Sequence, residues 1–151
     1  MICAKLLQTV LLSAFAWVTA CMHAAPATPL PRLPAHAVEY VDSSGTYVRW
    51  WGDVERCAGR AAPFAFKRVK FYMVMSDSRG LRVANGHVVA GLTYIRLRAV
   101  VIASPYVFDA MLLRHEMLHL VASPTHDPEY FQRRCRGVVV CAGSCISDTL
   151  R

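Results

Sequence analysis

Apolar side chains recur at helical spacing in two long segments of the chain. In the first, residues 44–59, they fall every three or four positions, as Tyr47, Trp50, Trp51, Val54 and Cys57. This period places them on one face, so the segment predicts an amphipathic helix whose tryptophans belong to the core. Gly59 is a suitable residue at which to end that helix.

The second helical segment covers residues 104–122. Its first residue is a serine, which we expect to cap the helix, and Pro105 suits the first helical position. Asp109 falls early in the helix, where a negative charge is favourable. The sequence Ser-Pro-Thr at residues 123–125 interrupts the helix, and residues 126–135 predict a short third helix.

Between the two long helices, polar and apolar residues alternate, which is the period of a half-buried strand. The strand-like segments are residues 65–75, 81–84 and 87–102, and the alternation is clearest in residues 69–75 and 93–98. The dipeptide Asn85-Gly86 joins the last two segments and is a strong hairpin signal. We therefore expect about three antiparallel strands before the second helix, with His87 at the surface beside the turn.

This order of elements predicts an α+β fold. We expect an N-terminal helix, a small and mainly antiparallel sheet, the 104–122 helix, and a short C-terminal helix followed by a cysteine-rich tail. The chain has 151 residues, which is enough for one domain with its own core. We place that domain at residues 36–151.

The N-terminus predicts export. Lys5 precedes an apolar run over residues 6–18, which is short for a membrane span and typical of a signal peptide. The run ends in Val18-Thr19-Ala20-Cys21, which resembles the bacterial lipobox. We therefore interpret residues 1–20 as a signal peptide and Cys21 as the lipidated N-terminus. The rival interpretations are a plain signal peptide cleaved a few residues later and a retained anchor helix.

Residues 22–35 carry four prolines and predict an extended tether. The expected location is the bacterial cell envelope, on the periplasmic side, with the chain anchored by lipid or secreted. Removing residues 1–20 takes away one lysine and no acid, so the formal charge falls from +7 to +6. The basic residues are scattered, which favours a solvated surface over a nucleic-acid interface. We expect the protein to be a monomer that contacts the membrane only through the lipid on Cys21.

The cysteines predict disulfides. Cys3 leaves with the signal peptide, and four cysteines remain in the domain: Cys57, Cys135, Cys141 and Cys145. An even number in an oxidising compartment implies two disulfides, with three possible pairings. Cys57, at the end of its helix, would join that helix to the C-terminal segment. The rival hypothesis is a structural zinc site on the last three cysteines.

The pattern His-Glu-x-x-His, at His115, Glu116 and His119, carries the candidate chemistry. Positions i and i+4 share one face of a helix, so both imidazoles can bind one ion. Glu116 is turned about 100° away from His115 around the helix axis. It can therefore act as a general base on a water that zinc acidifies.

A catalytic zinc ion requires three protein ligands and one open position. His126 is our expected third ligand, because the break at residues 123–125 can return the chain to the metal. Glu129 and Asp127 are the rival third ligands.

With these motifs, "HEMLH" followed by "HDPEYF" resembles the zincin superfamily of metallopeptidases, and most of all its compact bacterial and SprT-like members. The resemblance covers about residues 96–135 and implies a compact zincin-like domain that binds one Zn²⁺ and hydrolyses a peptide or protein. It implies an active-site helix packed on a small mixed sheet, whose edge, by analogy residues 93–99, holds the extended substrate. It also suggests Tyr130 as an oxyanion stabiliser.

The chain departs from the zincin pattern in the spacing of the third ligand and in its small size. These departures motivate an alternative, a catalytically inactive zincin-like envelope lipoprotein that acts as a binding or assembly module. The intact Glu116 argues for the enzyme, because an inactive site has no chemical need for that carboxylate. A structural lipoprotein without a metal is a third hypothesis.

Overall fold

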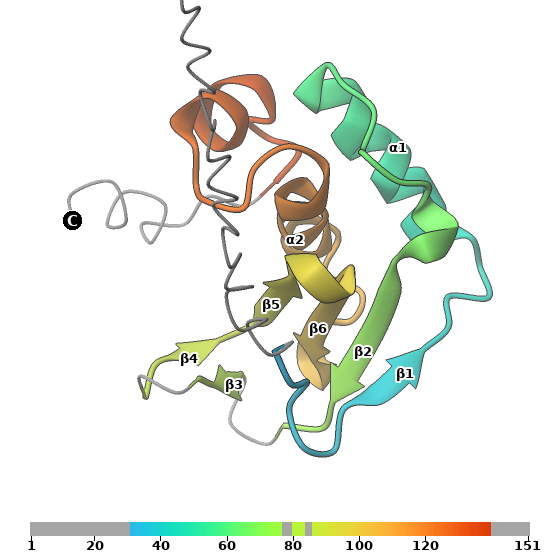
Figure 1. Ribbon diagram of the computed structural model, residues 1–151, viewed down its shortest axis with the longest axis vertical. Coiled ribbons are helices and arrows are strands. Elements are labelled where there is room, and N and C mark those ends of the chain that lie inside the picture. Colours follow the sequence, from blue (N-terminus) through green and yellow to red (C-terminus); the bar gives the residue numbers. More distant parts are fainter. Residues whose placement is uncertain (1–30, 77–79, 84–85, 140–151) are drawn as a thin grey trace, which may run out of the picture.

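Two helices cover one face of a small mixed sheet in the computed structural model, which describes residues 31–76, 80–83 and 86–139 (Figure 1). The helices and strands follow the chain in this order: β1 Val38–Tyr40, α1 Thr46–Ala58, β2 Lys70–Val74, β3 Leu81–Arg82, β4 Val88–Val89, β5 Gly91–Tyr94, β6 Ala99–Ala103 and α2 Ala110–Val121. A π-helical segment, η4, follows at Glu129–Arg134, and short 3₁₀ turns lie at residues 66–68, 95–97 and 104–106.

The main sheet has the strand order β1-β2-β6-β5, and β3 and β4 form a separate hairpin. The β1–β2 and β6–β5 pairs are antiparallel, so the expected α+β fold with a mainly antiparallel sheet is confirmed. The central β2–β6 pair is parallel, which the strand pattern did not predict. It arises because the chain passes through the hairpin and β5 before β6 returns beside β2.

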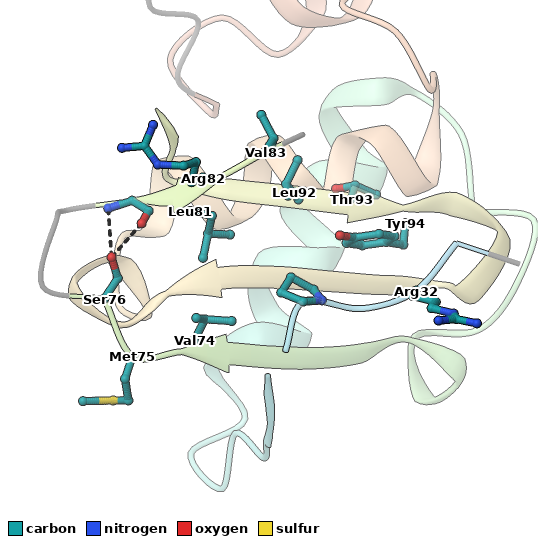
Figure 2. A pocket seen from close by; sticks show the side chains of 12 residues that line it. Arg32, Val74, Met75, Ser76, Leu81, Arg82, Val83, Leu92, Thr93 and Tyr94 are labelled. Carbon is teal, nitrogen blue, oxygen red and sulfur yellow. Dashed lines mark hydrogen bonds between the residues drawn. The ribbon is translucent and has the colours of Figure 1, made fainter. Parts of the chain in front are cut away.

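The core lies on both faces of β6, the strand in which every residue is buried. Val100 and Ile102 face the helices and pack in the larger cluster with residues of α1, α2 and η4. Val101 and Ala103 face the other way and pack with Leu81. Val74 and Leu92 line this second face of the sheet beside Leu81 (Figure 2).

Helix α1 ends where the sequence predicted. Gly59 follows its last residue in the left-handed conformation, with φ of 67°. The predicted hairpin is also present, with Leu81 paired to Val89 and Arg82 to Val88. Gly86 adopts a positive φ of 84°, as a tight turn requires.

Three predicted boundaries were wrong. The strand expected over residues 65–75 begins with a 3₁₀ turn and becomes extended only at Lys70. The segment 87–102 is divided by a second such turn, after which Arg98 has a φ of 51°. Helix α2 begins at Ala110, because the carboxylate of Asp109, and not Ser104, accepts hydrogen bonds from the first free backbone N–H groups.

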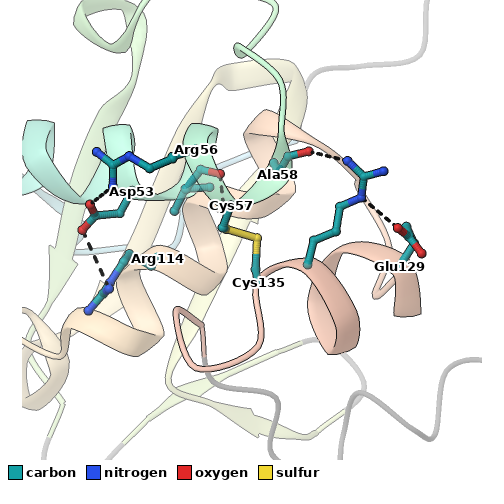
Figure 3. Close-up of a disulfide and its surroundings, with 9 residues drawn as sticks. Asp53, Arg56, Cys57, Ala58, Arg114, Glu129 and Cys135 are labelled. Carbon is teal, nitrogen blue, oxygen red and sulfur yellow. Dashed lines mark hydrogen bonds and ion pairs between the residues drawn. A yellow bond between two sulfur atoms is a disulfide. The ribbon is translucent and has the colours of Figure 1, made fainter.

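A disulfide joins Cys57 of α1 to Cys135, directly after η4, with 5.0 Å between the Cα atoms (Figure 3). This confirms that Cys57 joins α1 to the C-terminal segment, and it removes the thiolate of Cys135 from the rival zinc site. Arg134 strengthens the same junction, because its guanidinium donates to the Ala58 carbonyl at 3.2 Å. Cys141 and Cys145 lie outside the described residues.

Within the described part of the chain, no helix combines the length and hydrophobicity needed to cross a membrane.

We predict that the double substitution Cys57→Ala/Cys135→Ala destabilises the domain by about 2–5 kcal/mol, because the bond closes a long loop of 78 residues. Urea denaturation of the full chain measures the change. The control is Glu129→Gln, which breaks exposed ion pairs at the same junction and should leave the midpoint close to wild type. An unchanged midpoint in the double variant would contradict the prediction.

Candidate metal centre

Three imidazoles converge beside the C-terminal half of α2. His115 and His119 come from that helix, and His126 comes from the turn between α2 and η4. One ring nitrogen from each lies within 4.8 Å of the other two, so the three residues could hold one metal ion. The expectation that the break at residues 123–125 returns His126 to its partners is therefore met.

The spacing of these nitrogens suits a metal centre. The Nε2 atoms of His115 and His126 are 3.1 Å apart. Two nitrogen ligands, each about 2.0–2.1 Å from a tetrahedral ion, stand about 3.3 Å apart. The distance between this pair is therefore close to that of two ligands on one ion, and imidazole ligands suit zinc, copper, iron and nickel.

The backbone orients His119. Its Nδ1 lies 3.0 Å from the carbonyl oxygen of Ser123. A carbonyl only accepts, so Nδ1 carries the hydrogen and Nε2 keeps the lone pair that a metal requires. Burial lowers the pKa of His119 to about 4. The ring is therefore neutral at physiological pH, when it can act as a ligand.

The ring of Phe131 packs against all three imidazoles. Its ring centroid lies 4.8 Å from those of His115 and His119 and 5.1 Å from that of His126. Only 1% of Phe131 is exposed. An aromatic ring with no polar atom restricts the imidazole rotamers without competing for the ion, so Phe131 positions all three candidate ligands.

Glu116 lies against strand β5. Its side chain is buried, and its Oε2 accepts a hydrogen bond from the Thr93 hydroxyl at 2.6 Å. The same hydroxyl lies 2.9 Å from the Glu116 carbonyl oxygen. Burial raises the pKa of Glu116 to about 7, and the hydrogen bond from Thr93 opposes part of this increase.

Gly91 makes room for the glutamate. A Cβ atom at this position would stand 3.0 Å from both Cγ and Oε1 of Glu116, and 2.8 Å from Cδ1 of Ile102. These distances are shorter than ordinary van der Waals contacts, so any larger residue would push Glu116 or the strand aside. The glycine thus allows α2 to lie close to β5 at the position of the candidate base.

The rival third ligands have other partners. The carboxylate of Glu129 forms ion pairs with Arg133 and Arg134, which lower its pKa. Oδ1 of Asp127 accepts a hydrogen bond from the Glu129 backbone N–H at 2.9 Å. Both carboxylates therefore stabilise the start of η4, and His126 is the residue that joins the histidine pair.

The guanidinium of Arg134 lies over the Tyr130 ring, 5.7 Å from its centroid, and the oxyanion role of Tyr130 stays a prediction.

The predicted range of the substrate-binding edge, residues 93–99, extends beyond the strand. Strand β5, at the end of the sheet, covers residues 91–94, residues 95–97 form a 3₁₀ turn, and Ala99 belongs to β6.

Sequence reasoning missed the residues that support the ligands and the base, namely Gly91, Thr93, Ser123 and Phe131. Thr93 and Gly91 lie two residues apart in one strand, so the alternation places them on one face. That they meet Glu116 depends on how α2 packs, which the pattern does not contain. Ser123 acts through its carbonyl oxygen, which any residue would provide.

Comparison with known proteins found no matching family model, no matching curated protein and no matching solved structure.

The pKa values of Glu116 and His119 change in opposite directions. They therefore predict opposite effects of pH on folding stability when a chelator keeps the protein free of metal. Glu116 favours its protonated form in the folded state. Its contribution to the free energy of unfolding is therefore fully present below pH 4.5 and is lost as the pH rises toward 7. His119 favours its neutral form in the folded state. Its contribution to the free energy of unfolding is therefore fully present above pH 6.5 and is lost as the pH falls toward 4. Each effect amounts to at most about 3 kcal/mol.

The measurement is urea denaturation of wild type, Glu116→Gln and His119→Gln across this pH range. The stability of wild type relative to Glu116→Gln should fall as the pH rises. The stability of wild type relative to His119→Gln should rise. Parallel pH profiles for all three proteins would show that neither group titrates as its burial implies.

We predict that Phe131→Leu weakens Zn²⁺ binding by about 10- to 100-fold, as is typical when the support of a metal ligand is lost. A chelating dye that competes for the ion measures the affinity at pH 7. Phe71→Leu is the matched control, because Phe71 is a buried aromatic of the same core. Equal affinities in the two variants would mean that Phe131 contributes only to general packing.

Proposed function

We propose that this chain is an exported zinc-dependent peptidase in which His115, His119 and His126 bind one Zn²⁺ and Glu116 is the general base. The observation that carries the proposal is a buried carboxyl group on the same helix as two of three convergent histidines. Bound zinc would acidify a water molecule and polarise the scissile carbonyl.

The residues of the chain supply the rest of the chemistry. A general base works best when its pKa lies near the working pH, and burial raises the pKa of Glu116 to about 7 before any ion is bound. Glu116 can therefore take a proton from the attacking water and return it to the leaving amine. Thr93 holds the carboxylate during both transfers through its hydrogen bond to Oε2.

Strand β5 is the surface that we propose for the substrate. It forms one end of the sheet, so an extended peptide can add to it by main-chain hydrogen bonds. Such a peptide would pass beside Glu116, because Gly91 and Thr93 of this strand both contact that residue. Tyr130 is proposed to stabilise the oxyanion.

The proposed location is the bacterial cell envelope, with Cys21 carrying the lipid and residues 22–35 forming the tether. The disulfide between Cys57 and Cys135 supports an oxidising compartment. The lipid is the proposed membrane contact, and the working unit is proposed to be a monomer.

Metal analysis and a peptide library, applied to the purified chain and three variants, test the proposal. Glu116→Gln should keep one zinc per chain and lose about 10²- to 10⁴-fold in kcat/KM. His126→Ala should lose zinc and activity together. Glu129→Gln is the control and should keep both.

Two outcomes would overturn the proposal. Wild type without stoichiometric zinc would remove its basis, as would a Glu116→Gln variant as active as wild type. One zinc per chain without hydrolysis would instead favour the zincin-like binding module.

A further inference from the structure

The face of the sheet opposite α2 carries a cavity of about 500 Å³. Its floor is apolar, with Val74, Leu81 and Leu92, and Tyr94 lies at one side (Figure 2). The cavity is open to solvent on one side and is lined by residues of β2, β3 and β5 and by Arg32 and Pro34. A volume of this size suits a side chain or a small ligand.

Strand β5 connects this cavity to the candidate active site. Gly91 and Thr93 face α2, where both meet Glu116. Because side chains alternate along a strand, Leu92 and Tyr94 face the opposite way and line the cavity, which Thr93 also borders. A peptide paired with β5 would continue this alternation, so one of the residues beside its scissile bond would direct its side chain to the cavity face.

The charges around the cavity indicate which side chain fits. Arg32 and Arg82 border it at opposite ends, and the Arg82 guanidinium donates to the Gly86 carbonyl at 3.2 Å (Figure 2). None of the twelve described residues that line it carries a carboxylate. Guanidinium groups bind carboxylates through paired hydrogen bonds, and the apolar floor can cover an aliphatic stem. The lining therefore matches an acidic side chain, glutamate best of all.

We propose that this cavity is a specificity pocket that selects an acidic residue beside the cleaved peptide bond. The proposal rests on the proposed peptidase function. Arg32 and Arg82 are the residues that determine the selectivity, and the apolar side chains between them receive the stem of the substrate residue.

The test uses the zinc-loaded full chain and sets of peptides that differ only in having Glu, Gln or Lys at each position beside the cleaved bond. At one of these positions, kcat/KM should favour Glu over Gln by about 10-fold, the size of one or two exposed ion pairs. Arg32→Gln/Arg82→Gln should reduce this ratio to about 1 by slowing cleavage of the Glu peptide. Arg82→Glu should move the preference toward Lys.

The control is Arg56→Gln, since Arg56 is an exposed arginine of α1 and should leave the ratio as in wild type. Cleavage without preference for Glu would overturn the specificity pocket and leave the peptidase proposal standing, as would a preference that survives in the double variant. If no peptide is cleaved, the peptidase proposal fails. The pocket is then tested by anisotropy, where equal binding of Glu and Gln peptides would overturn it.

Discussion

The close packing of α2 on β5 is the contact on which the candidate site depends. It is possible because Gly91 has no side chain, and it buries Glu116 against the strand, where Thr93 donates to the carboxylate. The same helix turns His115 and His119 toward His126. One helix thus supplies both the candidate base and two of the three candidate ligands.

Opposite the strand, η4 completes the arrangement. It carries Phe131 under the three imidazoles, and the turn before it supplies His126. A helical segment of six residues is too short to hold its position by its own backbone hydrogen bonds. The disulfide at Cys135 and the contact of Arg134 with the end of α1 hold it instead. Support for the ligands therefore extends from the sheet through α2 to α1.

The features that could be predicted from the sequence are those with a local cause. The period of the apolar residues gave α1, Gly59 gave its end, and the i, i+4 spacing gave the two helical ligands. The parallel pairing of β2 with β6 could not be predicted, because it depends on the path of the chain between them. Nor could the true start of α2, because Ser104 and Asp109 are both good caps and only tertiary packing selects between them.

The disulfide also fixes an order of events. The nitrogen ligands, the glutamate and the strand that receives it all lie between Cys57 and Cys135 in the chain. Because a polypeptide is made from its N-terminus, every residue of the candidate centre has been synthesised before the second sulfur exists. The bond between Cys57 and Cys135 can therefore form only after every residue of the candidate centre has been synthesised.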